Sequence, residues 1–368
     1  MAIINGTAND DVLPGNDEND RIDGLGGNDV LLGNGGDDEL YGGDGNDELY
    51  GGGGSNTLSG GGGDDLVTVT RTFSDPASVD VADGGAGADT LIVDFAGSGL
   101  QLTFTLNGAS SDGSISSSNF EALVYTGGSG NDIVTGAAGS DQLFGYAGND
   151  TLAGAAGADQ LDGGDGSDVL RGGAGADAID GGAGIDTASY YTGATGVVVS
   201  LASGLGSGGE AQGDTLSGIE NLSGSQGWDQ LYGNAGANVL QGWNGNDLLV
   251  GRAGKDTLTG GAGADRFQFT AIGDSVVGAN ADRITDFNRA QGDKIDLSGI
   301  DANTGAAGNQ AFSFIGSGLF GHHAGELRAA VTSPGITTIA GDVNGDGVSD
   351  FHITLTGSLS LVAADFVL

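Results

Sequence analysis

The stretch Gly163-Gly164-Asp165-Gly166-Ser167-Asp168-Val169-Leu170-Arg171 contains the pattern that decides the fold of this chain. Its nine residues have glycine at positions 1, 2 and 4, aspartate at position 6 and an apolar residue at position 8. Glycine allows the positive φ angles and the close backbone approach that a tight turn requires. The last three residues can form only a very short strand, with the apolar side chain pointing inward. One such block is therefore expected to be a turn followed by a strand.

The same block recurs in three arrays that begin at Gly6, Gly127 and Gly224, and one isolated copy spans residues 84–92. Repeats of this kind stack their units on one another to bury a continuous core. Two blocks would make one coil, so apolar residues 18 positions apart should lie on one another in the same sheet, as Leu13 on Leu31. The core is then a narrow aliphatic ladder, too thin to stabilise the fold alone.

The sixth positions of the blocks contain the candidate metal ligands. Stacked coils bring these carboxylates together at the turns, where they repel one another unless a cation lies between them. Ca²⁺ suits such a site because it accepts carboxylate and backbone carbonyl oxygens as ligands. Solvated acidic turns without metal are the alternative, but they leave the periodic aspartates without compensation. The predicted ligands are Asp11, Asp20, Asp29, Asp38, Asp47, Asp65, Asp89, Asp132, Asp141, Asp150, Asp159, Asp168, Asp177, Asp186, Asp229, Asp247, Asp256 and Asp265.

Three residues depart from this pattern in the turns. Asn56 and Asn238 replace the sixth-position aspartate, so each keeps an oxygen but loses a charge, and we expect a weaker or absent ion there. Lys255 lies directly before Asp256 and is expected to weaken that site.

The composition excludes several classes of function. The 368 residues include 78 glycines and no cysteine, and 50 acidic against 10 basic residues give a net charge of −40. This charge repels nucleic-acid phosphates, so no nucleic-acid partner is expected. Without cysteine there is neither a disulfide framework nor a Cys-ligated zinc site, and no apolar run approaches the roughly 18 residues of a transmembrane segment. Acidic, glycine-rich chains are typically disordered, which we expect to be the calcium-free state.

The blocks resemble the RTX (repeats-in-toxin) unit G-G-x-G-x-D-x-U-x, in which U is apolar, also known as the hemolysin-type calcium-binding repeat. The segments Phe267-Gln268-Phe269, Gly292–Leu297 and the terminal Asp365-Phe366-Val367-Leu368 resemble the C-terminal domain of serralysin-type metalloproteases. This second resemblance implies a cap on the β-roll and an uncleaved type I secretion signal, hence a secreted, extracellular or cell-surface protein. A cap is also needed physically, because an open solenoid end exposes unpaired strand edges.

The predicted fold is all-β, a parallel β-roll (β-solenoid) of nonapeptide repeats with β inserts and a C-terminal β cap domain. In the first insert, residues 100–106 alternate between apolar and polar as a half-buried strand does. Each insert is either an irregularity of the solenoid or a surface for a ligand. The expected segments are a first array at 1–68, an insert at 69–126 containing the isolated repeat, a second array at 127–189, an insert at 190–223, a third array at 224–268, and the cap and secretion region at 269–368.

Residues 342–350 offer one further metal candidate. The run Asp342-x-Asn344-x-Asp346-Gly347 resembles the start of an EF-hand calcium loop. The twelfth position of that motif is Ile353 instead of glutamate, so the full motif fails, although Asp350 could supply a ninth-position ligand. Two alternatives stay open, namely an ion bound by these residues or a polar turn before a strand.

No catalytic motif is found in the sequence. The zinc motif H-E-x-x-H is absent, as are the nucleophile elbow and the phosphate-binding loop. His322 and Glu326 are expected in a surface turn, and Trp228 and Trp243 either stack on sugar or are merely exposed aromatics. Met1 is followed by a short apolar stretch without a basic region, so a cleaved signal peptide is not expected.

The expected function is that of a non-enzymatic RTX protein that folds on extracellular Ca²⁺ after type I secretion and has a surface, adhesion or matrix role. One alternative is a non-catalytic accessory module for an extracellular hydrolase or polysaccharide-modifying enzyme. Another is an enzyme whose site lies in the inserts. The expected partners are calcium ions, the type I secretion machinery, and either cell-surface polysaccharide or a second copy of the chain.

Overall fold

The computed structural model describes residues 1–70, 78–96, 98–99 and 101–368. Within them there is no α-helix, and the helical segments are the short 3-10 turns η1 (Gly209–Ala211), η2 (Ile272–Asp274) and η3 (Ala363–Asp365). None of the described segments forms a helix long and apolar enough to cross a membrane. The predicted all-β class is confirmed. The chain divides into two compact units, Met1–Asp186 and Thr187–Leu368.

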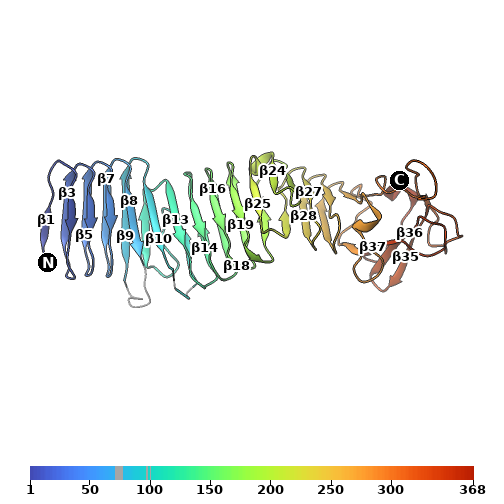
Figure 1. The fold of residues 1–368 in the computed structure, drawn as a ribbon, viewed down its shortest axis with the longest axis horizontal. Coiled ribbons are helices and arrows are strands. Elements are labelled where there is room, and N and C mark those ends of the chain that lie inside the picture. Colours follow the sequence, from blue (N-terminus) through green and yellow to red (C-terminus); the bar gives the residue numbers. More distant parts are fainter. Residues whose placement is uncertain (71–77, 97, 100) are drawn as a thin grey trace. The chain divides into compact units, whose positions relative to one another are not determined.

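The first unit consists of short parallel strands that stand side by side in successive coils, drawn blue to green in Figure 1. One sheet contains β1 (Ile3–Asn5), β3 (Arg21–Gly26), β5 (Glu39–Asp44), β7 (Thr57–Gly62), β9 (Asp80–Ala86) and β12 (Ile115–Ser118). A second contains β2 (Val12–Pro14), β4 (Val30–Leu32), β6 (Glu48–Tyr50), β8 (Leu66–Thr70), β10 (Thr90–Asp94), β13 (Ala122–Thr126), β15 (Gln142–Phe144), β17 (Gln160–Asp162) and β20 (Ala178–Asp180). A third contains β11 (Thr103–Thr105), β14 (Ile133–Thr135), β16 (Thr151–Ala156) and β19 (Val169–Ala174), and β18 (Asp165–Gly166) pairs with β21 (Ala183–Gly184).

The register of these strands is the one that an 18-residue coil requires. Leu13 pairs with Leu31 and Leu31 with Leu49, and on the other sheet Ile22 pairs with Leu40. Each of these side chains is buried, and their neighbours along the strand face outward. The predicted stacking of apolar residues 18 positions apart is therefore confirmed.

The first insert is partly built of strands that continue the roll. The isolated repeat forms β10, which pairs with β8 on one side and β13 on the other. Of the stretch expected to form a strand at 100–106, residue 100 lies outside the described residues, and β11 spans Thr103–Thr105. Phe104 from this strand is buried and pairs with Val134.

The second unit contains two main sheets. One contains β22 (Thr187–Ser189), β26 (Asn221–Ser223), β28 (Val239–Asn244), β30 (Thr257–Ala262), β32 (Asp282–Ile284), β37 (Phe351–Thr356), β36 (Ile336–Asp342), β35 (Glu326–Ser333) and β34 (Ser313–Phe314). The other contains β23 (Val198–Ser200), β27 (Gln230–Tyr232), β29 (Leu248–Val250), β31 (Arg266–Gln268), β33 (Lys294–Asp296) and β38 (Phe366–Val367), and β24 (Leu205–Ser207) and β25 (Thr215–Ser217) pair antiparallel at β23.

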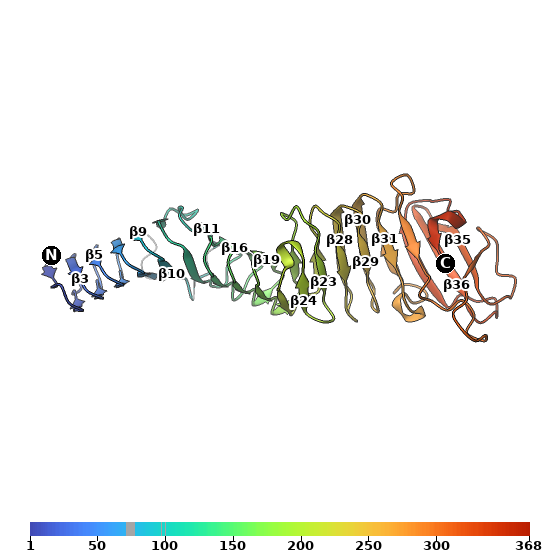
Figure 2. The same cartoon turned by 90° about the horizontal axis from the view of Figure 1, so that it is seen from above.

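The last hundred residues change from parallel coils to antiparallel pairing. β35, β36 and β37 form an antiparallel set, and β37 joins it to the roll by pairing in parallel with β32. Figure 2 shows β35 and β36 as the long strands near the C-terminus. The terminal strand β38 pairs with β33, and Asp365 just before it forms an ion pair with Arg289. The C-terminal segment is thus folded into the sheet.

We predict that Leu152→Ala destabilises the calcium-loaded protein by about 2–5 kcal/mol, because it leaves a cavity in a fully buried ladder position. Leu152 pairs with Val134 on one side and with Leu170 on the other. Both neighbours are themselves buried, so no exposed side chain can move into the cavity. Urea denaturation in saturating Ca²⁺ measures the loss. The matched control is Thr151→Ala, whose side chain is only partly buried, and an equal loss from both variants would contradict the ladder core.

Candidate metal-binding turns

The sixth-position aspartates lie at the turns between strands, where almost all of them are buried. Asp11 in the first repeat is partly exposed, whereas each of the other predicted repeat ligands is at most 2% exposed. Burial of a carboxylate is costly unless hydrogen bonds or a cation compensate it. The contacts of the two carboxylate oxygens therefore decide what these turns can hold.

One oxygen of the repeat carboxylates after Asp11, Oδ1, is used by the fold itself. The backbone N–H of Asp29 donates to Asp47 Oδ1 at 2.8 Å, and the N–H of Asp150 donates to Asp168 Oδ1 at 2.7 Å. The same bond recurs from coil to coil in all three arrays, always from a residue to the one 18 positions later. This ladder fixes the position of every carboxylate in the stack.

The second oxygen, Oδ2, accepts no hydrogen bond from the described residues in ten of the repeats, although it is fully buried. A buried acceptor without a partner is rare in a folded protein and calls for an explanation such as a bound ion. The repeat residues that show it include Asp29, Asp38, Asp47, Asp65, Asp89, Asp150, Asp168, Asp247, Asp256 and Asp265.

In the first two repeats of each array, Oδ2 of the aspartate, or Oδ1 of Asn238, does have a partner. The backbone N–H of the second position turns inward and donates to it, as from Thr7 to Asp11 at 2.7 Å, from Ala137 to Asp141 at 2.9 Å and from Ser225 to Asp229 at 2.7 Å. We call these self-capped turns, and the later ones open turns. The self-capped turns are those of Asp11, Asp20, Asp132, Asp141, Asp229 and Asn238.

The backbone of the second position separates the two kinds of turn. In the open turns this residue has a positive φ even where it is not glycine, for example 70° at Tyr146, 84° at Ala155 and 77° at Trp243. In the self-capped turns it lies outside the left-handed region. Positive φ costs a non-glycine residue free energy and persists only where surrounding interactions hold it, often at ligand sites. The open turns that have a non-glycine residue at this position are therefore held in a strained conformation.

The first position of each repeat forms the floor of a small oxygen-lined space. A Cβ atom on Gly42 would lie 2.3 Å from Asp47 Oδ2 and 2.5 Å from the carbonyl oxygen of Gly60, so no side chain fits there. Two acceptors thus converge on one point without a donor between them. A carboxylate and a carbonyl oxygen are the ligand types that Ca²⁺ prefers. The donor set of the open turns therefore fits calcium, which would supply the missing positive charge.

Burial raises the pKa of the open-turn carboxyl groups above its ordinary value of 3.8. It reaches about 8 at Asp247, about 7 at Asp150 and Asp256, and about 6 at Asp65 and Asp265. Desolvation is the largest cause in each case, and nearby carboxylates such as those of the stacked coils add to it. The raised pKa values mean that few favourable interactions in these turns offset the cost of burying the carboxylates in their charged form.

Three aspartates outside the nonapeptide frame continue the same ladder. Asp80, Asp282 and Asp293 accept the backbone N–H groups of Asn56, Asp256 and Asp265, at spacings of 24, 26 and 28 residues. Oδ2 of Asp282 is buried without a partner, as in the open turns. Sequence reasoning missed all three because it followed a fixed period. The signal available in the sequence was an apolar residue two positions after each of these aspartates, as in the repeats.

The two asparagines fall into different kinds of turn. Asn56 lies in an open turn, where its amide nitrogen contacts the carbonyl oxygen of Gly54 at 3.5 Å and so occupies the place of an oxygen ligand. Asn238 lies in a self-capped turn, and its Nδ2 donates to the carbonyl of Glu220 at 2.7 Å. Weak or absent ion binding at both residues stays a prediction, now with a contact that accounts for each.

The loop at 342–350 is closed by its own hydrogen bonds. Asp342 is fully buried and accepts the backbone N–H groups of Gly345 and Gly347, and Asp350 accepts that of Val343. Across the described residues, no group of three or more histidine or acidic side chains is placed to hold a metal ion. A metal in the repeats must therefore use backbone carbonyls besides carboxylates, and an ion bound by Asp342, Asn344, Asp346 and Asp350 stays a prediction.

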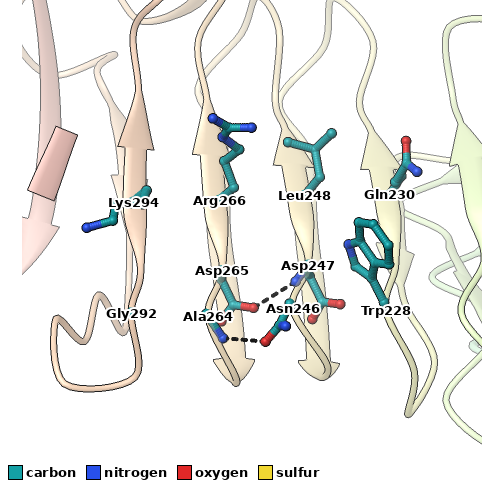
Figure 3. Close-up of a pocket in the computed structure, with 10 residues that line it drawn as sticks. All are labelled: Trp228, Gln230, Asn246, Asp247, Leu248, Ala264, Asp265, Arg266, Gly292 and Lys294. Atoms are coloured by element: carbon teal, nitrogen blue, oxygen red, sulfur yellow. Dashed lines mark hydrogen bonds between the residues drawn. The ribbon is translucent and has the colours of Figure 1, made fainter. Parts of the chain in front are cut away.

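The outer face of β27, β29, β31 and β33 contains a groove of about 410 Å³ in the second unit. Gln230, Leu248, Arg266 and Lys294 lie in one row across these strands, as Figure 3 shows. Trp228 lies beside this row with 68% of its surface exposed, whereas Trp243 donates its indole N–H to Ser223.

His322 and Glu326, which the sequence places in a surface turn, have different hydrogen-bond partners. The ring of His322 contacts the carbonyl oxygen of Asp346, and Glu326 accepts the backbone N–H of Gly321. No hydrogen bond joins the two residues.

The family models match most of the chain in two parts. The RTX calcium-binding nonapeptide repeat matches residues 3–31, 32–67, 77–94, 126–161 and 154–188, and the Peptidase M10 serralysin C terminal model matches residues 214–368. This chain carries RTX calcium-binding repeats and a serralysin-type C-terminal region. RTX repeats bind calcium ions, so multiple Ca²⁺ ions are its cofactor. The C-terminal match begins at 214 and so includes the third array and the end of the second insert.

Two known proteins match part of the chain. Metallopeptidase AprA of Pseudomonas marginalis is 37% identical over 95 residues, which are 26% of this chain and 18% of that relative. The chain therefore spans less than a fifth of its length. The AlgE6R3 subunit of the Azotobacter vinelandii mannuronan C5-epimerase is 36% identical, with a TM-score of 0.30 over 40% of this chain and 77% of that one. Both matched families are calcium-binding families of secreted proteins, as the sequence predicts.

We predict that acid favours the folded RTX protein when calcium is absent. Because burial raises the pKa of Asp150 to about 7 and of Asp247 to about 8, the folded state binds more protons than the unfolded state between about pH 4 and pH 8. This contribution to stability is present below the folded pKa and is lost as pH rises through it. In EDTA, far-UV circular dichroism should show more β structure at pH 5 than at pH 9.

Calcium should reverse this direction, because protons compete with the ion for the same oxygens. The apparent affinity for Ca²⁺ should fall as pH falls from 8 to 5, and binding at pH 7 should release protons. As a control, Asp247→Asn removes one of the titrating groups and should reduce the proton release. An increase of β structure with rising pH in EDTA would contradict the burial of uncompensated carboxyl groups.

Proposed function

We propose that this chain is a secreted, non-enzymatic RTX protein that leaves the cell unfolded through the type I secretion machinery and folds on extracellular Ca²⁺. In its folded form it would have a surface, adhesion or matrix role. The observation that carries the proposal is the set of buried carboxylate oxygens in the open turns, which the fold positions but does not satisfy.

Charge makes folding without the ion unfavourable. The chain has a net charge of −40, and the coils place its buried aspartates 18 residues apart in register. Each of these groups must lose its hydration on folding, which is unfavourable for a carboxylate unless a cation pairs with it. In a cell with little free Ca²⁺ the unfolded chain is then the stable form, as export through a narrow channel requires.

Ion binding is large enough to drive folding. When free Ca²⁺ exceeds Kd tenfold, each site contributes about 1.4 kcal/mol, so roughly ten sites contribute about 14 kcal/mol. The whole stability of an ordinary domain is about 5–15 kcal/mol. The calcium sites can therefore account for the difference between a disordered and a folded chain.

The C-terminal segment supports the order of events. If its last four residues are the secretion signal, folding would hide them, because Phe366 is buried and pairs with Ile295. Asp365 is 1% exposed and receives two hydrogen bonds from Arg289. Recognition by the export machinery would then have to precede calcium binding, which agrees with folding outside the cell.

We predict a cooperative gain of β structure when Ca²⁺ is titrated into the EDTA-treated protein. Circular dichroism follows folding, and light scattering on the same sample follows assembly, which a matrix role would require. Mg²⁺ is the control, because its demand for octahedral geometry suits these carbonyl-rich turns poorly. The same β content in EDTA and in millimolar Ca²⁺ would show that calcium does not drive folding.

The groove of the second unit favours a second candidate, a saccharide-binding accessory module. The exposed indole of Trp228 offers an apolar face on which a sugar ring can stack. Gln230 and Asn246 add amide groups for hydroxyl groups, and Arg266 adds a cation whose Nε lies 3.1 Å from Asp296 Oδ2. An apolar surface with a few placed polar groups is the usual composition of a small-ligand site.

We predict that Trp228→Ala abolishes retention of the calcium-loaded protein on a glycan array if this groove binds saccharide. The control is Leu319→Ala, which removes another exposed apolar side chain and should leave retention unchanged. The array carries both neutral and uronic-acid saccharides, and preference for the latter would assign a role to Arg266. Unchanged retention of the Trp228→Ala protein would exclude the groove as the binding site.

A further inference from the structure

The two kinds of turn are distributed according to their place in each array. In all three arrays the first two repeats, which make the first coil, are self-capped, and every later repeat has a positive φ at its second position. The isolated repeat, which pairs with the coil before it, also has this backbone, with φ of 110° at Gly85. The distinction therefore follows from stacking and not from residue type alone.

A preceding coil accounts for the difference physically. In the second coil of the second array, the third-position N–H donates to the second-position carbonyl of the coil before, from Ala156 to Ala137 at 3.0 Å and from Ala147 to Gly128 at 3.1 Å. This bond helps to hold Ala155 and Tyr146 in the left-handed region. The first coil has no such coil before it in its own array. Its second-position N–H turns inward instead and donates to the aspartate.

The consequence for each carboxylate is different. In the open turn of Asp150, Oδ2 is left without a donor in a space lined by a carbonyl oxygen, because a Cβ on Gly145 would lie 2.3 Å from Oδ2 and 2.6 Å from the carbonyl oxygen of Gly163. In a self-capped turn, as at Asp141, a backbone N–H already satisfies Oδ2. That N–H points its positive end at Oδ2 and so competes with an ion for this oxygen.

We propose that the first coil of each array is closed by backbone hydrogen bonds without calcium, and that in the roll only the open turns and the turn of Asp282 hold Ca²⁺. The proposal rests on the proposed calcium-driven folding and narrows its ligand set. It removes Asp11, Asp20, Asp132, Asp141 and Asp229 from the predicted ligands and adds Asp282. Each array then begins with a metal-independent coil on which the calcium-dependent coils stack.

Asp141 and Asp150 provide a matched pair for the test. They occupy successive repeats of one array, both are 1% exposed, and Oδ1 of each accepts a backbone N–H, from Leu123 at 2.6 Å and from Asp132 at 2.7 Å. They differ in the partner of Oδ2. Equilibrium dialysis of the full chain against Ca²⁺ gives the number of ions bound per chain, and circular dichroism in saturating Ca²⁺ confirms that each variant is folded.

The expected result is that Asp150→Asn lowers the ion count by at least one, whereas Asp141→Asn keeps the wild-type count. Equal losses from the two variants would overturn the proposal, and so would a loss from Asp141→Asn alone. If either variant fails to fold, Asp229→Asn and Asp247→Asn form the corresponding pair in the third array, with the same expected difference. A wild-type chain that binds no Ca²⁺ would instead overturn the calcium-driven folding itself, so the two failures are distinguishable.

Discussion

The structure depends on the burial of one carboxylate per turn in a stack of coils. Apart from Asp11, each repeat carboxylate has one oxygen that a backbone N–H of the preceding coil positions, and in open turns such as that of Asp47 the fold leaves the second oxygen for another partner. In the three-residue strands of the arrays the aliphatic ladder beside it is only one residue wide, since the neighbouring side chains on the strand are less buried. Cohesion along the roll therefore rests on backbone pairing, on this carboxylate ladder and on the cation that its second oxygen requires.

The ladder is tolerant of interruptions between coils. Where the nonapeptide period is broken, the chain loops out and returns with an aspartate that accepts the same backbone hydrogen bond, as Asp282 does 26 residues after Asp256. The period can vary because the loop lies outside the coil, whereas the short strand and its preceding carboxylate must return to register. The inserts thus leave the stacking of the strands within each unit intact.

The C-terminal region meets a different physical demand. Antiparallel strands β35, β36 and β37 replace coils there, and the terminal strand β38 is paired and held by the ion pair of Asp365 with Arg289. Pairing of the terminal strands protects sheet edges that would otherwise promote aggregation. The last residues can pair with β33 only when the second unit folds. This dependence is the basis for the proposal that export precedes folding.

The sequence by itself determined the all-β roll, the 18-residue register and the calcium cofactor, because a period of nine residues with fixed glycine and aspartate positions leaves few other ways to stack. It identified the repeat aspartates as candidates but treated them as equivalent. Only the tertiary structure distinguished Asp141 from Asp150, since the partner of Oδ2 depends on whether a coil precedes the turn. It alone also found Asp282 and the row of Gln230, Arg266 and Lys294, because residues that share a sheet face lie far apart in sequence.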